Sequence, residues 1–340
     1  MNKTIIIAEA GVNHNGDIKT AKKLIDVAAD AGVDYVKFQT FKADRVVSPS
    51  AKKAKYQFDN DSSKDDSQLS MLKKLELNDS DHKELISYCN SKNINFFSTA
   101  FDEEGIYYLS SLNFDMFKIP SGELTNFPYL RAIAKTGLPV ILSTGMANLN
   151  EIENSIHVLV SFGTKKSEIT VLHCNTDYPT PMSDVNLKAM LTIKKAFDVQ
   201  IGYSDHTLGT EVPIAAVALG AKVIEKHFTL DRNMEGPDHR ASLEPNELKE
   251  MVKSIRNIEK AISGNGLKEA SPSEIKNIHI ARKSIHLKRD LKLGSIITEK
   301  DIIPLRPGDG ICAMNWENII GKQVNKNLKK FTKLTLSDLS

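Results

Sequence analysis

Short apolar runs alternate with segments of helical periodicity over roughly the first 260 residues of the chain. The runs predict strands at Thr4–Ala8, Val33–Phe38, Ile94–Thr99, Met116–Ile119, Val140–Ser143, Ile169–Cys174, Val199–Tyr203 and Lys222–His227. Between them apolar residues recur with a period near 3.6, first at Ala21, Leu24, Ile25 and Ala28. Continuously apolar strands are typical of a parallel sheet covered by helices. Eight strand–helix units therefore predict an α/β fold, the (β/α)8 TIM barrel.

An open, doubly wound sheet is the alternative arrangement of alternating strands and helices. Its dinucleotide-binding form has a Gly-x-Gly-x-x-Gly turn after the first strand, and no such turn follows Thr4–Ala8. The periodic segments end near Gly264, so we expect a catalytic barrel over residues 1–264.

A second, smaller domain is predicted after the barrel. Residues 265–281 are expected to form a linker, in which Asn265–Ser273 is rich in Gly, Ser and Pro and Glu274–Ala281 is a short polar helix. Residues 282–340 contain short strand candidates at Lys283–Leu287, Gly294–Ile297 and Ile302–Leu305. This pattern predicts a compact module of about 60 residues.

One connection is unusually long for a barrel. From Lys42 to Leu77 no clear helix is predicted, and the low-complexity stretch Asp59–Asp66 lies within it. Loops of this length are usually lids, binding loops or flexible segments. Because it follows the carboxyl end of a strand, we expect it at the barrel mouth; the alternative is a solvated, charged loop.

Composition excludes several classes of protein. The 340 residues are 41% hydrophobic and 26% charged, a balance that can bury a substantial core. Formal charges of 45 and 43 leave a net +2, so neither nucleic acid nor a membrane is an expected partner. No apolar run approaches the roughly 20 residues of a membrane span, and the first ten residues lack a signal-peptide cleavage site, which favours a cytoplasmic protein. Three cysteines without a Cys-x-x-Cys pair argue against a disulfide scaffold or a cysteine-built zinc site.

Almost every predicted strand ends in a polar, reactive side chain. These residues are Glu9, Lys37, Gln39, Ser98, Thr99, Lys118, Ser121, Ser143, Thr144, His173, Ser204, Asp205, His206, Glu225 and His227. In a (β/α)8 barrel the strand ends converge on one rim, where active sites lie. Any single member also fits an ordinary structural role, so the hypothesis of an active site depends on their convergence.

Two pairs of these side chains predict specific chemistry. Lys37 and Lys118 would cradle a small polyanion, unless they point outward into solvent. His206 and His227 would lie on neighbouring strands and could share a divalent metal, or be hydrogen-bonded core residues. Carboxylates that could orient water or move protons, or cap helices instead, are Glu9, Glu123, Glu225 and Asp238.

The chain resembles the sialic acid (nonulosonate) synthase family. The matching segments occur in the family's order over nearly the whole chain, at Ala8–Gly16, Lys37–Lys42, Lys118–Glu123, Leu142–Met146, Tyr203–Thr207, Ile224–Asp231, Gly236–His239 and Arg306–Gly310. The resemblance implies a metal-dependent barrel followed by a small C-terminal antifreeze-like (SAF) domain.

The resemblance also implies roles for individual residues. His206 and His227 would bind the metal, with Mn²⁺ the expected ion and Mg²⁺ or Co²⁺ as substitutes. Phosphoenolpyruvate would contact Lys37, Thr99, Lys118, Ser121, Ser143, Ser204 and, at a position that varies in this chain, Asn175. Near the metal and the sugar would lie Glu9, Glu123, Glu225, Tyr178 and Asp238. Arg306 resembles the arginine that a swapped C-terminal domain lends to the partner's active site to contact the N-acetyl group, which implies a homodimer.

The expected reaction condenses phosphoenolpyruvate with an N-acetylmannosamine-type aldehyde and water, giving a nine-carbon 2-keto sugar acid and phosphate. N-acetylneuraminate is the expected product. The alternative is N,N'-diacetyllegionaminate, made from 2,4-diacetamido-2,4,6-trideoxymannose, and Ala8–Gly11 is the segment that hints at it. Two other classes remain open: a Schiff-base aldolase with a lysine nucleophile, and a non-catalytic sugar-binding protein.

Overall fold

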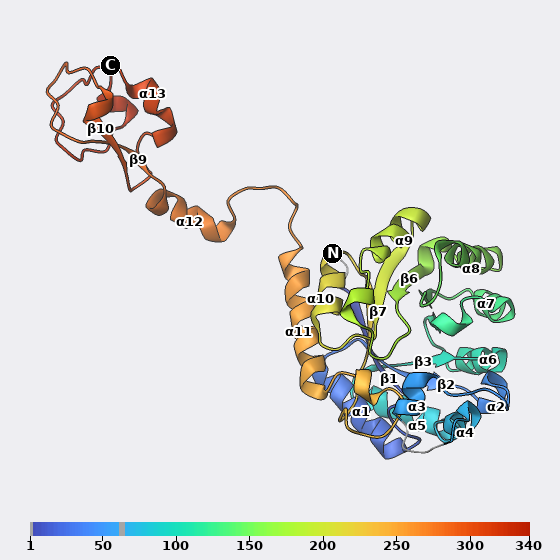
Figure 1. The fold of residues 1–340 in the computed structure, drawn as a ribbon. Coiled ribbons are helices and arrows are strands. Elements are labelled where there is room, and N and C mark those ends of the chain that lie inside the picture. Colours follow the sequence, from blue (N-terminus) through green and yellow to red (C-terminus); the bar gives the residue numbers. More distant parts are fainter. Residues whose placement is uncertain (1–2, 61–64) are drawn as a thin grey trace. The chain divides into compact units, whose positions relative to one another are not determined.

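The chain divides into two compact units, residues 1–263 and residues 264–340. The computed structural model describes residues 3–60 and 65–340 (Figure 1). Each unit is described by itself below.

The first unit is built on eight parallel strands. They are β1 (Ile5–Gly11), β2 (Tyr35–Thr40), β3 (Asn95–Ala100), β4 (Phe117–Ile119), β5 (Val140–Ser143), β6 (Ile169–Cys174), β7 (Gln200–Asp205) and β8 (Val223–His227). Their order in the sheet is β3-β2-β1-β8-β7-β6-β5-β4, so the first strand pairs with the last. Pairing of β1 with β8 curls the sheet into a nearly closed ring, and the predicted (β/α)8 barrel is confirmed.

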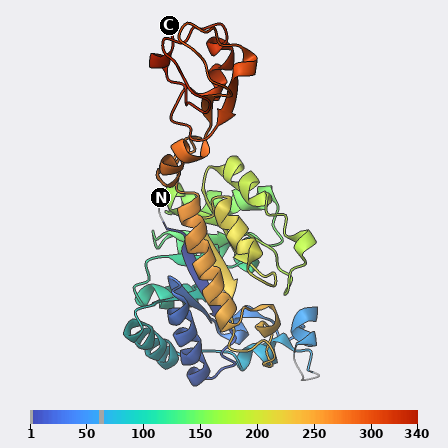
Figure 2. The ribbon, with the colours of Figure 1, turned by 90° about the vertical axis from the view of Figure 1, so that its left-hand side faces the viewer.

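Helices surround the strands (Figures 1 and 2). They are α1 (Ile18–Ala31), α5 (Asp79–Ser91), α6 (Glu103–Ser111), α7 (Phe127–Ala134), α8 (Leu149–Ser161), α9 (Ala189–Phe197), α10 (Glu211–Ala218) and α11 (Pro245–Ala261). In α1 the four predicted apolar positions are buried, and Gly32 ends the helix in the left-handed conformation with φ 75°. Figure 2 shows α11 lying along the outside of the strands.

Side-chain alternation along each strand separates two apolar cores. On β1, Ile6 and Ala8 face outward into the large core beneath the helices, whereas Ile7 faces into the barrel. The barrel interior is filled by Ile7, Phe97, Met116, Ile141, Leu172 and Val223. This apolar layer forms a floor, and the next inward positions along the strands lie above it.

The long connection after β2 contains three short helices, α2 (Ala43–Val46), α3 (Lys55–Asp59) and α4 (Gln68–Lys73). The prediction that it lacks helices was therefore wrong. Part of the low-complexity stretch, residues 61–64, lies outside the described residues. Met71 and Leu75 bury their side chains in a cluster with Val12 and Phe41, which holds this connection against the ends of β1 and β2.

The second unit consists of α12 (Pro272–Ala281), β9 (Ser284–Leu287), β10 (Ile302–Leu305) and α13 (Trp316–Ile319). Strands β9 and β10 are antiparallel, with Ile302 opposite Leu287. The strand predicted at Gly294–Ile297 was wrong: Gly294 is left-handed with φ 83°, and only an isolated bridge joins Ile296 to Gln323. The core of this unit comprises Ile285, Leu287, Leu291, Ile297, Ile302, Ile311, Ile319, Val324, Leu328 and Leu334.

Short 3₁₀ turns complete both units, at Ser121–Glu123, Lys166–Glu168, Met182–Asp184, His239–Ala241, Glu299–Asp301, Ala313–Asn315 and Leu336–Asp338. Among the described helices, none has the length and apolar character needed to cross a lipid bilayer.

Candidate active site

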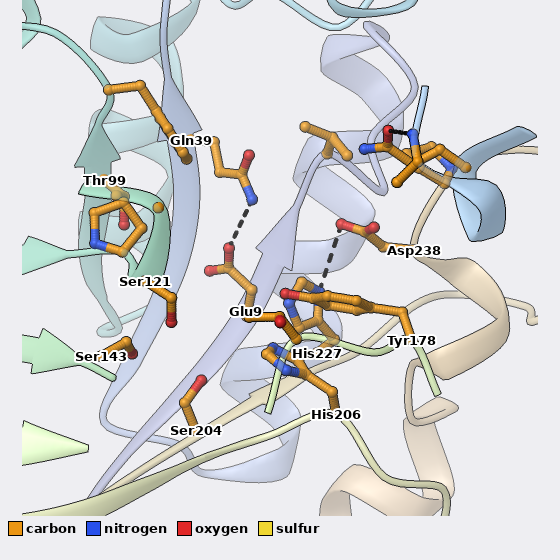
Figure 3. Close-up of a pocket in the computed structure, with 18 of the residues that line it drawn as sticks. Glu9, Gln39, Thr99, Ser121, Ser143, Tyr178, Ser204, His206, His227 and Asp238 are labelled. Atoms are coloured by element: carbon orange, nitrogen blue, oxygen red, sulfur yellow. Dashed lines mark hydrogen bonds and ion pairs between the residues drawn. The ribbon is translucent and has the colours of Figure 1, made fainter. Parts of the chain in front are cut away.

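A cavity of about 530 Å³ opens at the carboxyl ends of the barrel strands. Polar side chains from many strands point into it (Figure 3). The residues to which the family resemblance gives a role all line it except Glu123, Asn175 and Arg306; the lining members are Glu9, Lys37, Thr99, Lys118, Ser121, Ser143, Tyr178, Ser204, His206, Glu225, His227 and Asp238. Convergence on one rim, which the hypothesis of an active site requires, is thus observed for these residues.

Side chains along a strand point alternately into and out of the barrel, and this alternation explains why these side chains meet. Glu9 follows the inward-facing Ile7 by two residues, and Thr99 follows Phe97 in the same way. The parallel register then sets neighbours side by side, with Glu9 opposite both Lys37 and His227. A polar layer therefore lies directly above the apolar floor.

Two lysines and two glutamates form a buried network within this layer. Lys37 Nζ lies 2.7 Å from Glu9 Oε2 and 3.7 Å from Glu225 Oε2. It also donates to Thr99 Oγ1 at 3.0 Å, while Lys118 Nζ donates to Glu225 Oε1 at 3.1 Å. Lys37 and Lys118 are only 2% and 3% exposed, so the alternative of outward, solvated lysines is wrong.

The two glutamates differ in acidity. Burial raises the pKa of Glu9 to about 7, against the opposing effect of Lys37. Burial also opposes ionisation of Glu225, but Lys118 and Lys37 outweigh it and lower its pKa to about 2. Near neutral pH one carboxylate is therefore charged while the other can exchange a proton, as suits an acid–base group.

The two histidines lie beside each other, with ring centroids 5.2 Å apart. His206 Nδ1 donates to the carbonyl oxygen of Asn175 at 2.5 Å, so in the neutral imidazole Nε2 carries the lone pair. The ring of Tyr178 packs over His206 at 4.1 Å between centroids. A backbone partner on the second ring nitrogen is the usual way in which a metal-binding histidine is oriented.

His227 is suited to the same role. Its Nδ1 is buried without a hydrogen-bond partner and lies 3.8 Å from Asp238 Oδ2. Burial and the neighbouring His206 lower the pKa of His227 well below its ordinary value, which keeps the imidazole neutral and able to bind a cation. Two imidazoles suit a first-row divalent metal. Within residues 3–60 and 65–340 no group of three or more His, Cys, Asp and Glu side chains is arranged to hold a metal ion.

Three predicted site residues lie outside the cavity lining. Glu123, in the turn after β4, accepts a hydrogen bond from Asn126 Nδ2 at 2.6 Å. The side chain of Asn175 donates to the carbonyl of Asp184 at 2.9 Å, and only its backbone contacts His206. Arg306 belongs to the second unit, where its exposed side chain donates through Nε to a backbone carbonyl at 2.9 Å.

Several strand-end residues expected on the rim face outward instead. Ser98 Oγ lies 2.6 Å from Thr40 Oγ1, and His173 Nε2 donates to the carbonyl of Val185 at 2.8 Å. Asp205 accepts from Lys226 Nζ at 2.6 Å on the outer face of the barrel. Each lies one residue out of phase with an inward neighbour, so the strand phase rather than the residue type decides its position.

Sequence reasoning missed part of the lining. Cys174 follows the inward Leu172 by two residues, so a count along β6 finds it once Leu172 is known to face inward. Tyr56 stacks on Tyr178 with centroids 4.9 Å apart, but it comes from the long connection, where no periodic pattern predicts orientation. The same holds for Gln57 and Gln68, which also line the cavity.

Comparison with known proteins agrees with this geometry. The NeuB family model matches residues 24–268, and the SAF domain model matches residues 282–340. The chain is 56% identical to the N,N'-diacetyllegionaminic acid synthase of Campylobacter jejuni, over 97% of this chain and 98% of that protein. It is 48% identical to the enzyme of the same name from Legionella pneumophila, over 97% and 92% of the two chains.

A solved structure of a related enzyme has a similar fold. The crystal structure of N-acetylneuraminic acid (sialic acid) synthetase from Leptospira borgpetersenii, in complex with citrate, has a TM-score of 0.70 and 36% identity. The match covers 82% of this chain and 90% of that one. The predicted C-terminal SAF domain and the predicted resemblance are thus confirmed, and the chain belongs to the NeuB family.

Proposed function

We propose that this protein condenses phosphoenolpyruvate with the open-chain aldehyde of an N-acetylated amino sugar and water, giving a nine-carbon 2-keto sugar acid and phosphate. The observation that carries the proposal is a single cavity in which the lysine–glutamate network adjoins the histidine pair. One part suits an anionic substrate and the other a carbonyl oxygen. Membership of the NeuB family supports the same reaction.

The sugar is proposed to be 2,4-diacetamido-2,4,6-trideoxymannose, and the product N,N'-diacetyllegionaminic acid. Relatives that carry this name are 56% and 48% identical to the chain, whereas the N-acetylneuraminic acid synthetase compared above is 36% identical. These identities favour N,N'-diacetyllegionaminate, the alternative product, over N-acetylneuraminate, the product expected from the sequence. N-acetylneuraminate, from N-acetylmannosamine, is the second candidate because the same fold and cavity would serve it.

The network supplies a binding site for phosphoenolpyruvate. With Glu225 ionised and Glu9 protonated, two ammonium groups face one carboxylate, which leaves a net positive charge in a buried place. Lys37 and Lys118 would hold the carboxylate and phosphate of the substrate and stabilise charge that develops on them. Hydroxyl donors to the same oxygens would be Thr99, Ser121, Ser143 and Ser204.

A divalent metal, with Mn²⁺ expected and Mg²⁺ or Co²⁺ as substitutes, would be held by His206 and His227. When bound, such an ion supplies Lewis-acid polarisation of the aldehyde carbonyl. The buried, unpaired Nδ1 of His227 and the oriented ring of His206 support this assignment.

The bond changes are balanced by groups in the cavity. Carbon 3 of phosphoenolpyruvate forms a bond to the aldehyde carbon, water adds its oxygen at carbon 2, and the C–O bond to phosphate then breaks. Glu9 would accept the proton from water or protonate the new alkoxide, because its pKa of about 7 permits either. Asp238, whose pKa burial raises to about 6, is the other candidate and lies beside His227.

The test measures phosphate release with both substrates present. Chelated protein and a His206→Ala variant should lose activity, while a His157→Ala variant, on the exposed face of α8, should keep it. Formation of the sugar acid from pyruvate that survives chelation, together with borohydride trapping of a pyruvyl–lysine adduct, would favour the Schiff-base alternative. Absence of phosphate release, together with no product and no trapped adduct when pyruvate is offered, would favour a non-catalytic sugar-binding protein.

The proposal also includes a role for Arg306 in a homodimer. The cavity is lined by residues of the first unit, and exposed Arg306 on the second unit suits a swapped homodimer in which each chain lends this arginine to the other chain's sugar site. Glu123 and Asn175 are proposed to act from just outside the cavity. Asn175 would act through its backbone carbonyl, which accepts the hydrogen bond from His206.

We propose that the enzyme is located in the cytoplasm.

A further inference from the structure

The cavity has an apolar side that the reaction described above does not use. Val12, Phe41, Met71 and Leu75 are buried together there, and three partly buried side chains pack against them: Val46, Leu72 and Phe101. All seven line the cavity. We call this set the apolar wall.

The apolar wall lies one step beyond the polar layer. Phe41 follows Gln39 by two residues and Phe101 follows Thr99 by two, so the inward alternation of β2 and β3 continues past the strand ends. The two phenylalanine rings meet edge to face, with centroids 6.0 Å apart. A ligand whose reacting end lies at the polar layer would therefore place its far end against this wall.

Amide side chains accompany the wall. Gln57, in the middle of α3, and Gln68, the first residue of α4, line the same cavity. Gln57 Oε1 accepts from the backbone N–H of Ala54 at 2.9 Å, which fixes the amide in place. An apolar surface bordered by amides complements an acetamido group, because that group combines a methyl with a hydrogen-bonding amide.

The two candidate sugars differ in the groups that would face this wall. The diacetamido-trideoxy sugar carries a methyl at carbon 6 and an acetamido group at carbon 4, where N-acetylmannosamine carries hydroxyls. A hydroxyl buried against an apolar surface loses its hydrogen bonds to water, whereas a methyl gains from burial. We propose that the apolar wall is the subsite that selects a 6-deoxy, 4-acetamido sugar over a hydroxylated one. This inference rests on the proposed condensation reaction.

The experiment compares kcat/KM for the two sugars, each with phosphoenolpyruvate, in the full-length protein. Wild type should favour the diacetamido-trideoxy sugar by 10-fold or more, about the discrimination that an apolar pocket achieves against a hydroxyl. Leu72→Asn places an amide in the wall at nearly constant size and should shrink this preference by about 10-fold. Val46→Thr adds one hydroxyl with almost no change of shape and should shrink it in the same direction.

Leu69→Asn is the matched control, because Leu69 lies on the same helix α4, is also partly buried, and does not line the cavity. Its sugar preference should equal that of wild type. If Leu72→Asn does not fold, Val46→Thr decides the matter alone. A preference that is unchanged in the wall variants, or that changes as much in Leu69→Asn, overturns the subsite while the condensation reaction stands. Wild-type protein that releases no phosphate with either sugar overturns the proposed function itself, and the subsite with it.

Discussion

Lys226 and Asp205 form a buried ion pair on the outer face of β7 and β8. Both side chains are fully shielded from solvent, with Nζ 2.6 Å from Oδ2 and 2.5 Å from the carbonyl oxygen of Thr207. Each residue lies between two neighbours that line the cavity: Ser204 and His206 flank Asp205, while Glu225 and His227 flank Lys226. The pair therefore fixes the backbone that carries both histidines.

Removal of one partner should be costly. A Lys226→Met variant leaves the carboxylate of Asp205 buried without a counter-charge, so we expect the free energy of unfolding to fall by about 3–5 kcal/mol. The control is Lys52→Met, because Lys52 pairs with Asp66 at 3.0 Å but the two side chains are 78% and 58% exposed. That change should stay within about 0.5 kcal/mol. Urea denaturation measures both, and equal effects would contradict the prediction.

His14 is a second buried group whose charge affects stability. It is completely buried in the turn between β1 and α1, where Nδ1 accepts from the backbone N–H of Gly16 at 3.0 Å. Burial lowers its pKa from 6.5 to about 4. Between these values the unfolded chain binds a proton at this site and the folded chain does not, so stability falls as the pH falls from 6.5 to 4 and is unaffected above 6.5.

A His14→Gln variant isolates this contribution because glutamine does not titrate. The difference in unfolding free energy between wild type and variant should shrink by roughly 1.4 kcal/mol per pH unit below 6.5, levelling off near 4. Urea titrations at several pH values between 4 and 8 measure it. A difference that is constant over this range would contradict the prediction, because it would mean that the pKa of His14 is the same in the folded and the unfolded chain.

At the scale of elements, the turn after β1 and helix α4 meet at Gly16. The glycine is left-handed with φ 73°, and a Cβ added there would collide with the backbone carbonyl of Lys74 at the end of α4. Gly32, at the end of α1, has nearly the same φ of 75° but has no neighbouring atom within 4 Å of such a Cβ. The two glycines thus share the conformation and differ in the contact.

Alanine substitutions should separate the two effects. Gly32→Ala should cost about 1–2 kcal/mol of unfolding free energy, the cost of a left-handed residue with a side chain. Gly16→Ala should cost more and should also raise KM for the sugar, because the displaced α4 carries part of the apolar wall. Denaturation and steady-state kinetics test both statements. Equal stability losses and an unchanged KM would show that the contact with Lys74 is unimportant.

The barrel was predictable because its strands are continuously apolar at their centres. Errors gathered at the strand ends: β7 continues through the polar Ser204 and Asp205, which apolarity alone does not extend to. The phase of the side chains was also undetermined there, so Ser98 and His173 were expected on the rim although they face outward. The inward-facing residues at the strand ends are found by counting two residues onward from each residue of the apolar floor. The floor residues themselves can be recognised only once the strands are aligned.

The part of the site contributed by the connection after β2 could not be predicted. Helices α2, α3 and α4 have only four to six residues each, too few to show a helical period. Tyr56 and Leu72 reach the cavity because the apolar cluster with Phe41 holds the connection in place, a long-range contact without a local pattern. The family resemblance named the residues of the polar layer and left this side of the cavity undescribed.

At the scale of the whole molecule, the proposed site combines two chains. The described cavity lining comes from residues 1–263, whereas Arg306 lies in the unit 264–340. If each active site uses His206 of one chain and Arg306 of the other, two inactive variants should complement each other. His206→Ala and Arg306→Ala are each expected to lose most phosphate release alone. Mixing them under conditions that exchange subunits should restore activity.

The amount restored follows from counting. Random exchange makes half of the dimers mixed, and in each mixed dimer one of the two sites has both an intact His206 and an intact Arg306, so about a quarter of all sites should recover. If Arg306 served the cavity of its own chain, every site in a mixed dimer would still lack one of the two residues, and no activity would return. A mixture of His206→Ala with His227→Ala provides the control, because both residues line the cavity of a single chain and exchange cannot bring an intact pair together.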